Sequence, residues 1–541
     1  MKTLVSSSEA AALDIRTKND LCLRELQLME KATIRLWDSI RAALPNKGSK
    51  DMKILALAGK GNNGGDALAV LRHAWSAGFA NVSAIVSSEH LSPSCSAQAE
   101  SLASIGARMH PWSDVGLEMA RRMMGQADVV LDGILGTGIN GPARGEAREM
   151  IQAFPGQDAM GSEELVSGKR EGRPFIVSID VPSGLGDFFT LGFPAVRADI
   201  CCTLAPLKLA LLLPDARRFF GALRIVEDVF PATLVDIAGR NEDGASFRNA
   251  ILLEEEDMHS LLPKVPNDAY KMSRGKVSVF AGSHGHAGAA RLCAKAVGAG
   301  GAGYCTLHAD PDICGSLVPE IEPVVVSPWD GSGVPESSCH VFIVGPGWGE
   351  KPTRKAVLED LIAQRKPVVA DASALRLLAS LPDARAGKDA CLILTPHPGE
   401  YAALAMAKGI PAASPFLDSL PEVAKAYGAL VVYKSHVTAI CDLNGNLSIW
   451  DGMNPALGTA GSGDVLSGLI AGVVGVHAAQ ASVCGGRLDQ GQILRAVQGA
   501  VILHGVAGRN LARTEGWFSA DRLIKECARL AYDSMNQSKE R

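Results

Sequence analysis

Short runs of consecutive apolar residues alternate along the chain with longer segments in which apolar residues recur every three or four positions. The runs are typical of strands buried on both faces of a parallel sheet, and the longer segments are typical of covering helices. In the first half we expect helices at 21–43 and 67–78, with a glycine turn at 59–66 before the second. The apolar runs predict strands at 54–58, 82–86, 129–131, 175–179 and 199–204. This order predicts a doubly wound parallel sheet.

The second half shows the same alternation without a close repeat of the first. Residues 236–247 mix charge, glycine and asparagine without periodicity, which is typical of a linker, so we divide the chain into domains at 1–240 and 241–541. After the linker, apolar runs predict strands at 277–281, 304–309, 341–344, 368–370, 391–394, 430–434 and 438–442. The polar segment 155–174 is interpreted as a surface insertion without an assigned function.

Composition and charge favour a cytoplasmic α/β protein that acts on small molecules. The 541 residues are 47% hydrophobic and 5% aromatic and include 57 glycines, which suits buried strands joined by tight turns. A net charge of -5 without a long basic run argues against nucleic acid or an anionic membrane as partner. The N-terminus lacks the apolar core of a signal peptide, and glycines interrupt the longest apolar stretch. The 12 scattered cysteines favour a reducing compartment over a disulfide framework.

The segment 454–468 combines closely spaced glycines with a carboxylate. Gly461 and Gly463 let the backbone approach a ligand, and residues 465–476 predict a buried helix whose free N–H groups face that ligand. Asp464 falls in the first turn of this helix, where it either stabilises the helix end or takes a proton from a bound hydroxyl. We interpret the segment as an anion site with a base, while a glycine turn capped by Ser462 or Asp464 remains the simpler alternative.

Three polar segments of the first half each follow a predicted strand, at 61–66, 132–142 and 178–185. In an open α/β sheet the carboxyl ends of the strands form the ligand-binding edge. The first segment offers backbone N–H groups and amide oxygens, the second is a glycine turn that suits a phosphate, and the third places an acid after a buried strand. A single such turn is more often structural, but three together favour a site. None matches the GxGxxG fingerprint of ordinary dehydrogenases.

These three segments resemble the site motifs of the NAD(P)HX epimerase family over about residues 13–236. The resemblance implies a Rossmann-like fold that interconverts the R and S hydrates of NAD(P)H, with a potassium ion held by Asn63, Asp132 and Ser183. Asp180 is a candidate to shuttle the proton that epimerisation at C6 requires, and Lys208 is either a second candidate or a solvated lysine. The resemblance also implies a larger set of residues that bind the hydrated nucleotide: Asn62, Asn63, Gly64, Gly65, Asp66, Gly136, Thr137, Gly138, Ile139, Asn140, Gly141, Pro142 and Asp180.

Similar segments follow the predicted strands of the second half, at 282–290, 345–349, 371–375, 395–400 and 434–438. The first two are rich in small residues, which allow a ligand to approach the backbone. His397 lies between two prolines that restrict it, and it is either a ligand contact or a capping histidine. Lys434 begins a short run with hydroxyl groups that suits a phosphate.

The order of these segments, ending at 460–464, resembles the ADP- or ATP-dependent NAD(P)HX dehydratase family over about residues 251–531. The resemblance implies a ribokinase-like fold, use of ADP with magnesium, and Asp464 as the base that activates the C6 hydroxyl of the S hydrate toward phosphoryl transfer. It assigns the hydrated nicotinamide nucleotide to Ala289, Gly347, His397 and Asp464. It assigns the adenine nucleotide to Lys434, Ser435, His436, Val437, Thr438, Asn454, Gly458, Thr459, Ala460, Gly461, Ser462 and Gly463.

Both resemblances together imply a bifunctional NAD(P)H-hydrate repair enzyme. Its substrates would be NADHX, NADPHX and ADP, with NAD(P)H, AMP and phosphate as products, and we expect a homo-oligomer. Two alternatives remain. A ribokinase-like small-molecule kinase would use Asp464 and the same anion site to leave a stable phosphate ester. A nucleotide-binding protein with decayed catalysis would explain why Ala67 and residues 28–33 depart from the epimerase pattern.

Overall fold

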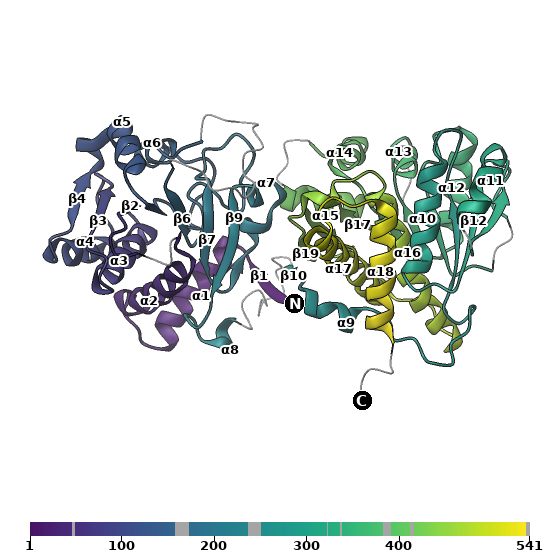
Figure 1. Ribbon diagram of the computed structural model, residues 1–541, viewed down its shortest axis with the longest axis horizontal. Helices are drawn as coiled ribbons and strands as arrows, with labels where there is room; N and C mark the ends of the chain where they lie inside the picture. Colours follow the sequence, from purple (N-terminus) through teal and green to yellow (C-terminus); the bar gives the residue numbers. More distant parts are fainter. Residues whose placement is uncertain are drawn as a thin grey trace. The chain divides into compact units, whose positions relative to one another are not determined.

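The computed structural model describes residues 1–45, 49–156, 173–235, 250–321, 323–335, 338–381, 391–411 and 416–536. They form two compact units, one from Thr3 to Ala250 and one from Ile251 to Arg541 that also includes Met1 and Lys2 (Figure 1). The predicted linker at 236–247, and all of the predicted insertion except residues 155–156 and 173–174, lie outside the described residues. Each unit is built of strands and helices that alternate, as the apolar runs predict.

A parallel sheet forms the first unit, with strands in the order β4-β3-β2-β5-β6-β7-β9. These strands are β2 (Ile54–Ala58), β3 (Val82–Val86), β4 (Arg108–Pro111), β5 (Val129–Gly133), β6 (Phe175–Ile179), β7 (Ala198–Leu204) and β9 (Phe220–Val226). In the middle, Ile54 lies beside both Val82 and Val129. The chain leaves β2 on one side and returns to β5 on the other, which opens a crevice at the carboxyl ends of these two strands.

Helices cover both faces of this sheet (Figure 1). On one face lie α2 (Glu25–Ala43), α3 (Asn62–Ser76) and α4 (Pro93–Ser104), and on the other lie α5 (Trp112–Gly125) and α6 (Gly145–Gln152). Ala56 of β2 and Leu68 of α3 are fully buried in the core between sheet and helices. Shorter elements are α7 (Pro214–Arg217), α8 (Ala232–Val235), and the paired strands β1 (Lys2–Val5) and β8 (Leu207–Lys208).

The structure corrects the sequence-based prediction of two helices in this unit. A helix, α1 (Ser7–Asp20), precedes the one expected from residue 21, which begins at Glu25. Its pattern is weak because only Leu13 and Thr17 of α1 are buried. Residues 62–66, predicted as a turn, instead form the beginning of α3. Gly64 is required there by packing, since a Cβ atom at this position would lie 2.0 Å from the Gly59 carbonyl oxygen.

The sheet of the second unit runs in the order β13-β12-β11-β14-β15-β16-β17-β18-β19-β10. The strands from β13 to β17 are parallel, and β18 and β19 are antiparallel to their neighbours. Their bounds are β10 (Ala250–Leu252), β11 (Lys276–Phe280), β12 (Tyr304–Ala309), β13 (Val325–Pro328), β14 (Val341–Val344), β15 (Val368–Ala370), β16 (Leu392–Leu394), β17 (Ala429–Tyr433), β18 (Val437–Cys441) and β19 (Leu447–Asp451). Because β11 lies between β12 and β14, the same kind of crevice forms at their carboxyl ends.

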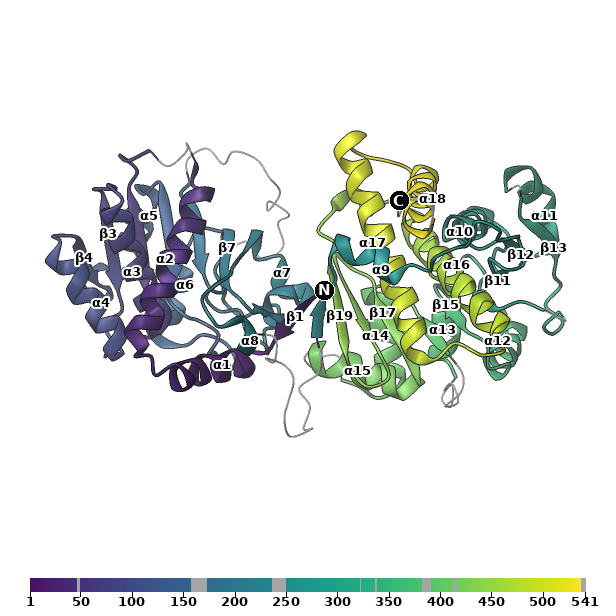
Figure 2. The ribbon, with the colours of Figure 1, turned by 90° about the horizontal axis from the view of Figure 1, so that it is seen from below.

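Two groups of helices cover the second sheet (Figure 2). One group contains α9 (Met258–Leu261), α10 (Ala287–Ala299), α16 (Ser462–Val483), α17 (Gln490–Thr514) and α18 (Ala520–Met535). The other contains α12 (Thr353–Ala363), α13 (Ser373–Ala379), α14 (Pro398–Ala407) and α15 (Phe416–Tyr427), while α11 (Pro311–Leu317) follows β12.

At the centre of the first group, α16 and α10 touch backbone to backbone. A Cβ atom at Gly468 would lie 2.4 Å from the Cys293 carbonyl oxygen, and one at Gly472 would lie 2.3 Å from the Val297 carbonyl oxygen. By length and composition α16 is apolar enough to cross a membrane, but 78% of its most apolar window is buried inside this unit. Its apolar sequence is therefore explained by its position in the core.

Candidate active sites

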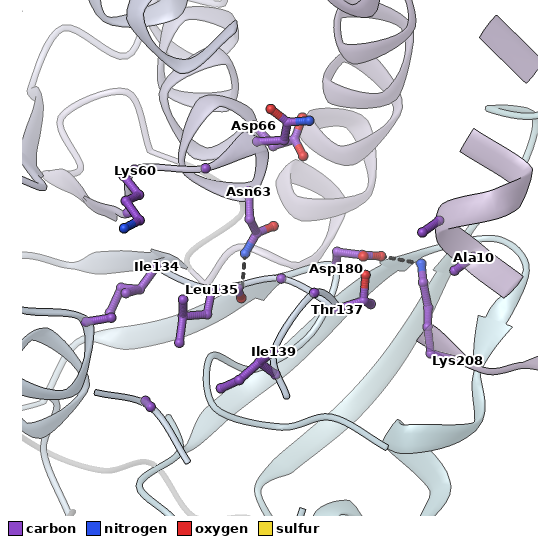
Figure 3. Close-up of a pocket in the computed structure, with 18 of the residues that line it drawn as sticks. Ala10, Lys60, Asn63, Asp66, Ile134, Leu135, Thr137, Ile139, Asp180 and Lys208 are labelled. Atoms are coloured by element: carbon purple, nitrogen blue, oxygen red, sulfur yellow. Dashed lines mark hydrogen bonds and ion pairs between the residues drawn. The ribbon is translucent and has the colours of Figure 1, made fainter. Parts of the chain in front are cut away.

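A cavity of about 760 Å³ lies at the carboxyl ends of β2, β5 and β6 in the first unit. Its walls come from the loops and helix starts after these strands, from α1 and from β8 (Figure 3). Gly64, Gly65 and Gly141 do not line it. The predicted nucleotide-binding residues that do line it are Asn62, Asn63, Asp66, Gly136, Thr137, Gly138, Ile139, Asn140, Pro142 and Asp180.

Asp132, in β5, does not line this cavity and is fully buried. Its carboxyl group accepts hydrogen bonds from Ser178 Oγ at 2.7 Å, from the Ser183 backbone N–H at 2.9 Å and from Ser183 Oγ. These donors are neutral, and burial raises the pKa of Asp132 although the hydrogen bonds from Ser183 oppose this. Asn63 Nδ2 donates to the Leu135 carbonyl at 2.9 Å, and the Leu135 N–H donates to Ser183 Oγ at 2.8 Å. The three predicted potassium ligands therefore meet around Leu135.

Asp180 and Lys208 form an ion pair at the edge of the cavity (Figure 3). Asp180 has a left-handed backbone with φ +62°, and its Oδ1 also accepts from the Leu204 N–H at 3.0 Å and from Thr203 Oγ1 at 3.3 Å. Lys208 is only 4% exposed and donates to the Leu204 carbonyl at 2.8 Å. It is therefore a buried partner of Asp180 and not a solvated lysine.

Asp66 projects from the first turns of α3 into the same cavity (Figure 3). Burial and the negative charge of Asp180 raise the pKa of Asp66 well above its ordinary value. Asp66 and Asp180 are therefore two carboxyl groups of the same cavity in different environments.

In the second unit, the start of α16 carries the predicted base. Gly461 has φ +89°, and Asp464 is the third residue of the helix. Ser462 is held by His504, whose Nε2 lies 3.2 Å from the Ser462 hydroxyl. Burial and the negative charge of Asp371 raise the pKa of Asp464 to about 7. A carboxyl group that titrates near neutrality suits a general base.

Lys434 connects this helix to the edge of the sheet. Its Nζ lies 2.7 Å from Asp371 Oδ1, and both side chains are mostly buried. A Cβ atom at Gly463 would lie 3.4 Å from the same Nζ. Lys434 thus lies against the glycine segment that begins α16, and its positive charge lowers the pKa of Asp464.

The loop after β14 has three glycines with left-handed backbones: Gly345, Gly347 and Gly349. A Cβ atom at Gly347 would lie 3.1 Å from the Cβ of Ala289, so two residues predicted to bind the hydrated nucleotide are in contact. His397, predicted for the same ligand, caps α14 by accepting from the Gly399 N–H at 3.1 Å.

A buried arginine, Arg354, packs against the same loop. Arg354 Nη2 donates to Asp310 Oδ1 at 2.5 Å, and its guanidinium lies over the Trp348 ring, 5.3 Å from the centroid. Both Arg354 and Trp348 are almost completely buried. Lys351 adds a second ion pair to Asp310 at 3.0 Å.

The residues predicted to bind the adenine nucleotide fall into two segments. Lys434, Ser435 and His436 form the turn between β17 and β18, whereas Val437 and Thr438 belong to β18 and are buried. The second segment consists of Asn454, Gly458, Thr459, Ala460, Gly461, Ser462 and Gly463, and it leads into α16. Asn454 Oδ1 accepts from the Ala456 N–H at 3.1 Å, which caps the 3-10 turn Pro455–Leu457.

Comparison with known proteins separates the chain into the same two parts. The family described as YjeF-related protein N-terminus matches residues 25–210, and the NAD(P)H-hydrate dehydratase family matches residues 277–529. The bifunctional NAD(P)H-hydrate repair enzyme Nnr of Coxiella burnetii is 28% identical over 91% of this chain and 92% of its own length. That of Moorella thermoacetica is 29% identical over 95% and 93%. The chain belongs to the bifunctional NAD(P)H-hydrate repair enzymes.

Among solved structures, the ADP/ATP-dependent NAD(P)H-hydrate dehydratase from Bacillus subtilis, co-crystallised with ATP and Mg²⁺, is similar to this chain. It is 23% identical, with a TM-score of 0.45, over 53% of this chain and 99% of its own. A ribokinase-like superfamily protein from Enterococcus faecalis is also 23% identical, with a TM-score of 0.45, over 54% and 98%.

Sequence reasoning about this repair enzyme missed several residues that shape its sites. Asp371 was visible as an acid after a strand but had no assigned role, and the structure pairs it with Lys434. Arg354 lies inside α12 and outside all of the motifs, so its burial beside the loop after β14 could be seen only in the structure. Asp14 lines the first cavity from α1, the helix that the apolar pattern did not predict.

Proposed function

We propose that the first unit epimerises R- and S-NAD(P)HX and that the second unit dehydrates S-NAD(P)HX with ADP, which yields NAD(P)H, AMP and phosphate. The observation that carries this proposal is the position of Asp464. It stands in the first turn of α16, near Lys434 and Asp371, with a pKa raised to about 7. A base, a cation and a helix N-terminus then converge on the place where a hydroxyl would meet a terminal phosphate.

In the proposed dehydration, Asp464 takes the proton of the C6 hydroxyl, and the oxygen attacks the terminal phosphorus of ADP while AMP leaves. The helix N-terminus and Lys434 stabilise the charge that develops on the phosphoryl oxygens. The phosphate then leaves C6 as the electron pair of N1 forms a double bond to C6. Transfer of a proton from C5 to water restores the dihydronicotinamide ring.

In the proposed epimerisation, Asp180 shuttles the proton that the exchange at C6 requires. Its hydrogen bonds from Thr203 and Leu204 and its ion pair with Lys208 fix the carboxylate at the cavity wall. The protonated C6 oxygen leaves as water while the electron pair of N1 forms a double bond to C6, and water then adds to either face of C6 and gives up the excess proton. The two epimers then interconvert without an oxidant or a nucleotide.

We assign a potassium ion to Asn63, Asp132 and Ser183, and these residues fit it. Asn63 uses its amide nitrogen for Leu135, which leaves the amide oxygen available, and the buried Asp132 carboxyl group has only neutral donors. A monovalent cation would supply the missing positive charge and orient the loop at Leu135.

In the second unit we propose that magnesium accompanies ADP, with no protein ligand assigned. We also propose that the enzyme is a cytoplasmic homo-oligomer. Its 12 cysteines are free thiols, and ten of them are buried, which fits a reducing compartment.

The proposal is tested by incubating the full chain with a mixture of both NADHX epimers, ADP, Mg²⁺ and K⁺. Complete return of NADH absorbance supports both activities, and a stop at about half indicates that the epimerase is inactive. No return of NADH overturns the proposal. A stable phosphate ester, detected by mass spectrometry, would instead identify the kinase alternative. Replacing ADP by ATP in the same assay decides the nucleotide.

A further inference from the structure

Asp66 and Asp180, two of the carboxyl groups that line the first cavity, have opposite surroundings. Asp180 receives hydrogen bonds from Leu204 and Thr203 and an ion pair from Lys208. Asp66 lines the same cavity, and among the described residues no group donates a hydrogen bond to its carboxyl oxygens. Asp66 is half-buried, and a half-buried carboxylate without protein donors is costlier to ionise than one that receives hydrogen bonds, as Asp180 does.

The charged groups around Asp66 favour the neutral form as well. Among these charges Asp180 raises the pKa of Asp66 most, followed by Asp14 on α1 and Glu25 on α2, and Lys208 opposes them. Lys18 does not compensate, because it is already paired with Asp14 at 2.6 Å and with Glu25 at 2.8 Å. On the side of α4, the Cys95 thiol has a pKa raised to about 11 by burial and stays neutral.

We propose that Asp66 is the general acid of the epimerase and that it acts together with Asp180 as the base. This inference rests on the proposed epimerase function and adds a second catalytic residue to it. Two carboxyl groups whose surroundings favour opposite protonation states are the usual arrangement for paired acid and base catalysis.

The proton movements balance as follows for one epimer. The carboxylic acid of Asp66 gives its proton to the C6 hydroxyl oxygen as the C6–O bond breaks, so that water leaves. The electron pair of N1 forms the N1–C6 double bond. Water then adds to the other face of C6, the double-bond pair returns to N1, and the excess proton passes to Asp180. The cycle closes when this proton returns to Asp66 through water in the cavity, and the other epimer follows the same steps in reverse.

The test measures epimerisation of purified R-NADHX without ADP by chromatographic separation of the two epimers, as a function of pH. The wild-type rate should fall on the alkaline side, where Asp66 becomes ionised and can no longer donate a proton. Asp66→Asn should reduce the rate about a hundredfold or more and remove the alkaline fall, since amides are not acids. Asp66→Glu should restore part of the rate.

Three controls separate this inference from folding and from the proposed function. Dehydration of S-NADHX by the same Asp66→Asn protein reports an intact second unit, and its circular dichroism spectrum reports the fold. Glu118→Gln, an exposed carboxyl on α5, should leave the rate and the pH profile unchanged.

Wild-type epimerisation together with a nearly unchanged rate in Asp66→Asn would overturn only the acid role. An alkaline fall that persists in Asp66→Asn would show that another group causes it and would also overturn the acid role. If Asp66→Asn does not fold, a wild-type profile without an alkaline fall overturns the inference. Absence of epimerisation in the wild type would instead overturn the proposed function.

Discussion

Replacing Asp371 by asparagine should shift the pH at which the dehydratase becomes active. Asp464 must be ionised to take the proton of the C6 hydroxyl, and its pKa is raised to about 7 first by burial and next by the negative charge of Asp371. The activity of the wild type should therefore rise with pH, reaching about a tenth of its plateau at pH 6 and about a hundredth at pH 5.

The size of the shift is bounded by the structure. Asp371→Asn removes the like charge and releases Lys434, whose Nζ lies 2.7 Å from Asp371 Oδ1 and whose charge lowers the pKa of Asp464. Both effects lower the pKa of Asp464, but burial, which is the largest cause of the raised pKa, remains. The midpoint of the variant should therefore lie between the ordinary value of 3.8 and about 7. At pH 5 to 6 the variant should keep a larger share of its own plateau than the wild type does.

The assay is kcat/KM for S-NADHX at a fixed ADP concentration from pH 5 to pH 8, with each protein normalised to its own plateau. Titration of ADP affects both proteins equally and cancels in the comparison. Asp360→Asn, an exposed carboxyl on α12, is the matched control and should not move the midpoint. Lys434→Met should move it upward because it removes the cation. An unchanged midpoint in Asp371→Asn, or a shift to higher pH, would refute the assignment of this limb to Asp464.

Three further predictions concern other parts of the two sites. Asp464→Asn should abolish dehydration and leave epimerisation intact. It should also raise the thermal unfolding midpoint more at pH 8 than at pH 5. The wild type loses stability as pH rises from 3.8 toward 7, because Asp464 has a pKa of about 7 in the folded state and ionises more readily when the chain is unfolded, whereas asparagine has no such cost. Asp132→Asn should remove any increase in thermal stability that KCl gives over LiCl at equal ionic strength, and an equal KCl effect in both proteins would contradict the potassium assignment. Arg354→Met should destabilise the second unit by about 3 kcal/mol in urea unfolding, at the lower end for a broken buried ion pair, because Lys351 still contacts Asp310. A loss below about 0.5 kcal/mol would show that the arginine does not hold the loop.

The strands could be predicted from the sequence because their signal is local. The predicted strands 54–58, 82–86, 175–179, 304–309, 341–344 and 368–370 agree with the structure residue for residue, since each is a mostly apolar run that is followed by a polar residue or glycine. The edge strand β4 was missed because it has an exposed arginine and a proline, and α1 was missed because it buries only two side chains.

The candidate sites could be predicted only as far as a motif follows a strand. Asp180 and Asp464 were found in this way, and their surroundings were not. The pairing of Lys208 with Asp180 depends on β8, a strand of two residues that no pattern marks. The difference between Asp66 and Asp180 arises from which donors reach each carboxyl, and this depends on contacts between residues far apart in the chain.

The backbone contact between α10 and α16 has a consequence for how the dehydratase can change. Asp464 is fixed by a helix that has no room to slide or rotate, because Gly468 and Gly472 lie directly against carbonyl oxygens of α10. Substitutions at these glycines would displace the base although neither residue touches a ligand. Variant libraries that aim to alter nucleotide use should therefore leave these two positions fixed and vary the loops around them.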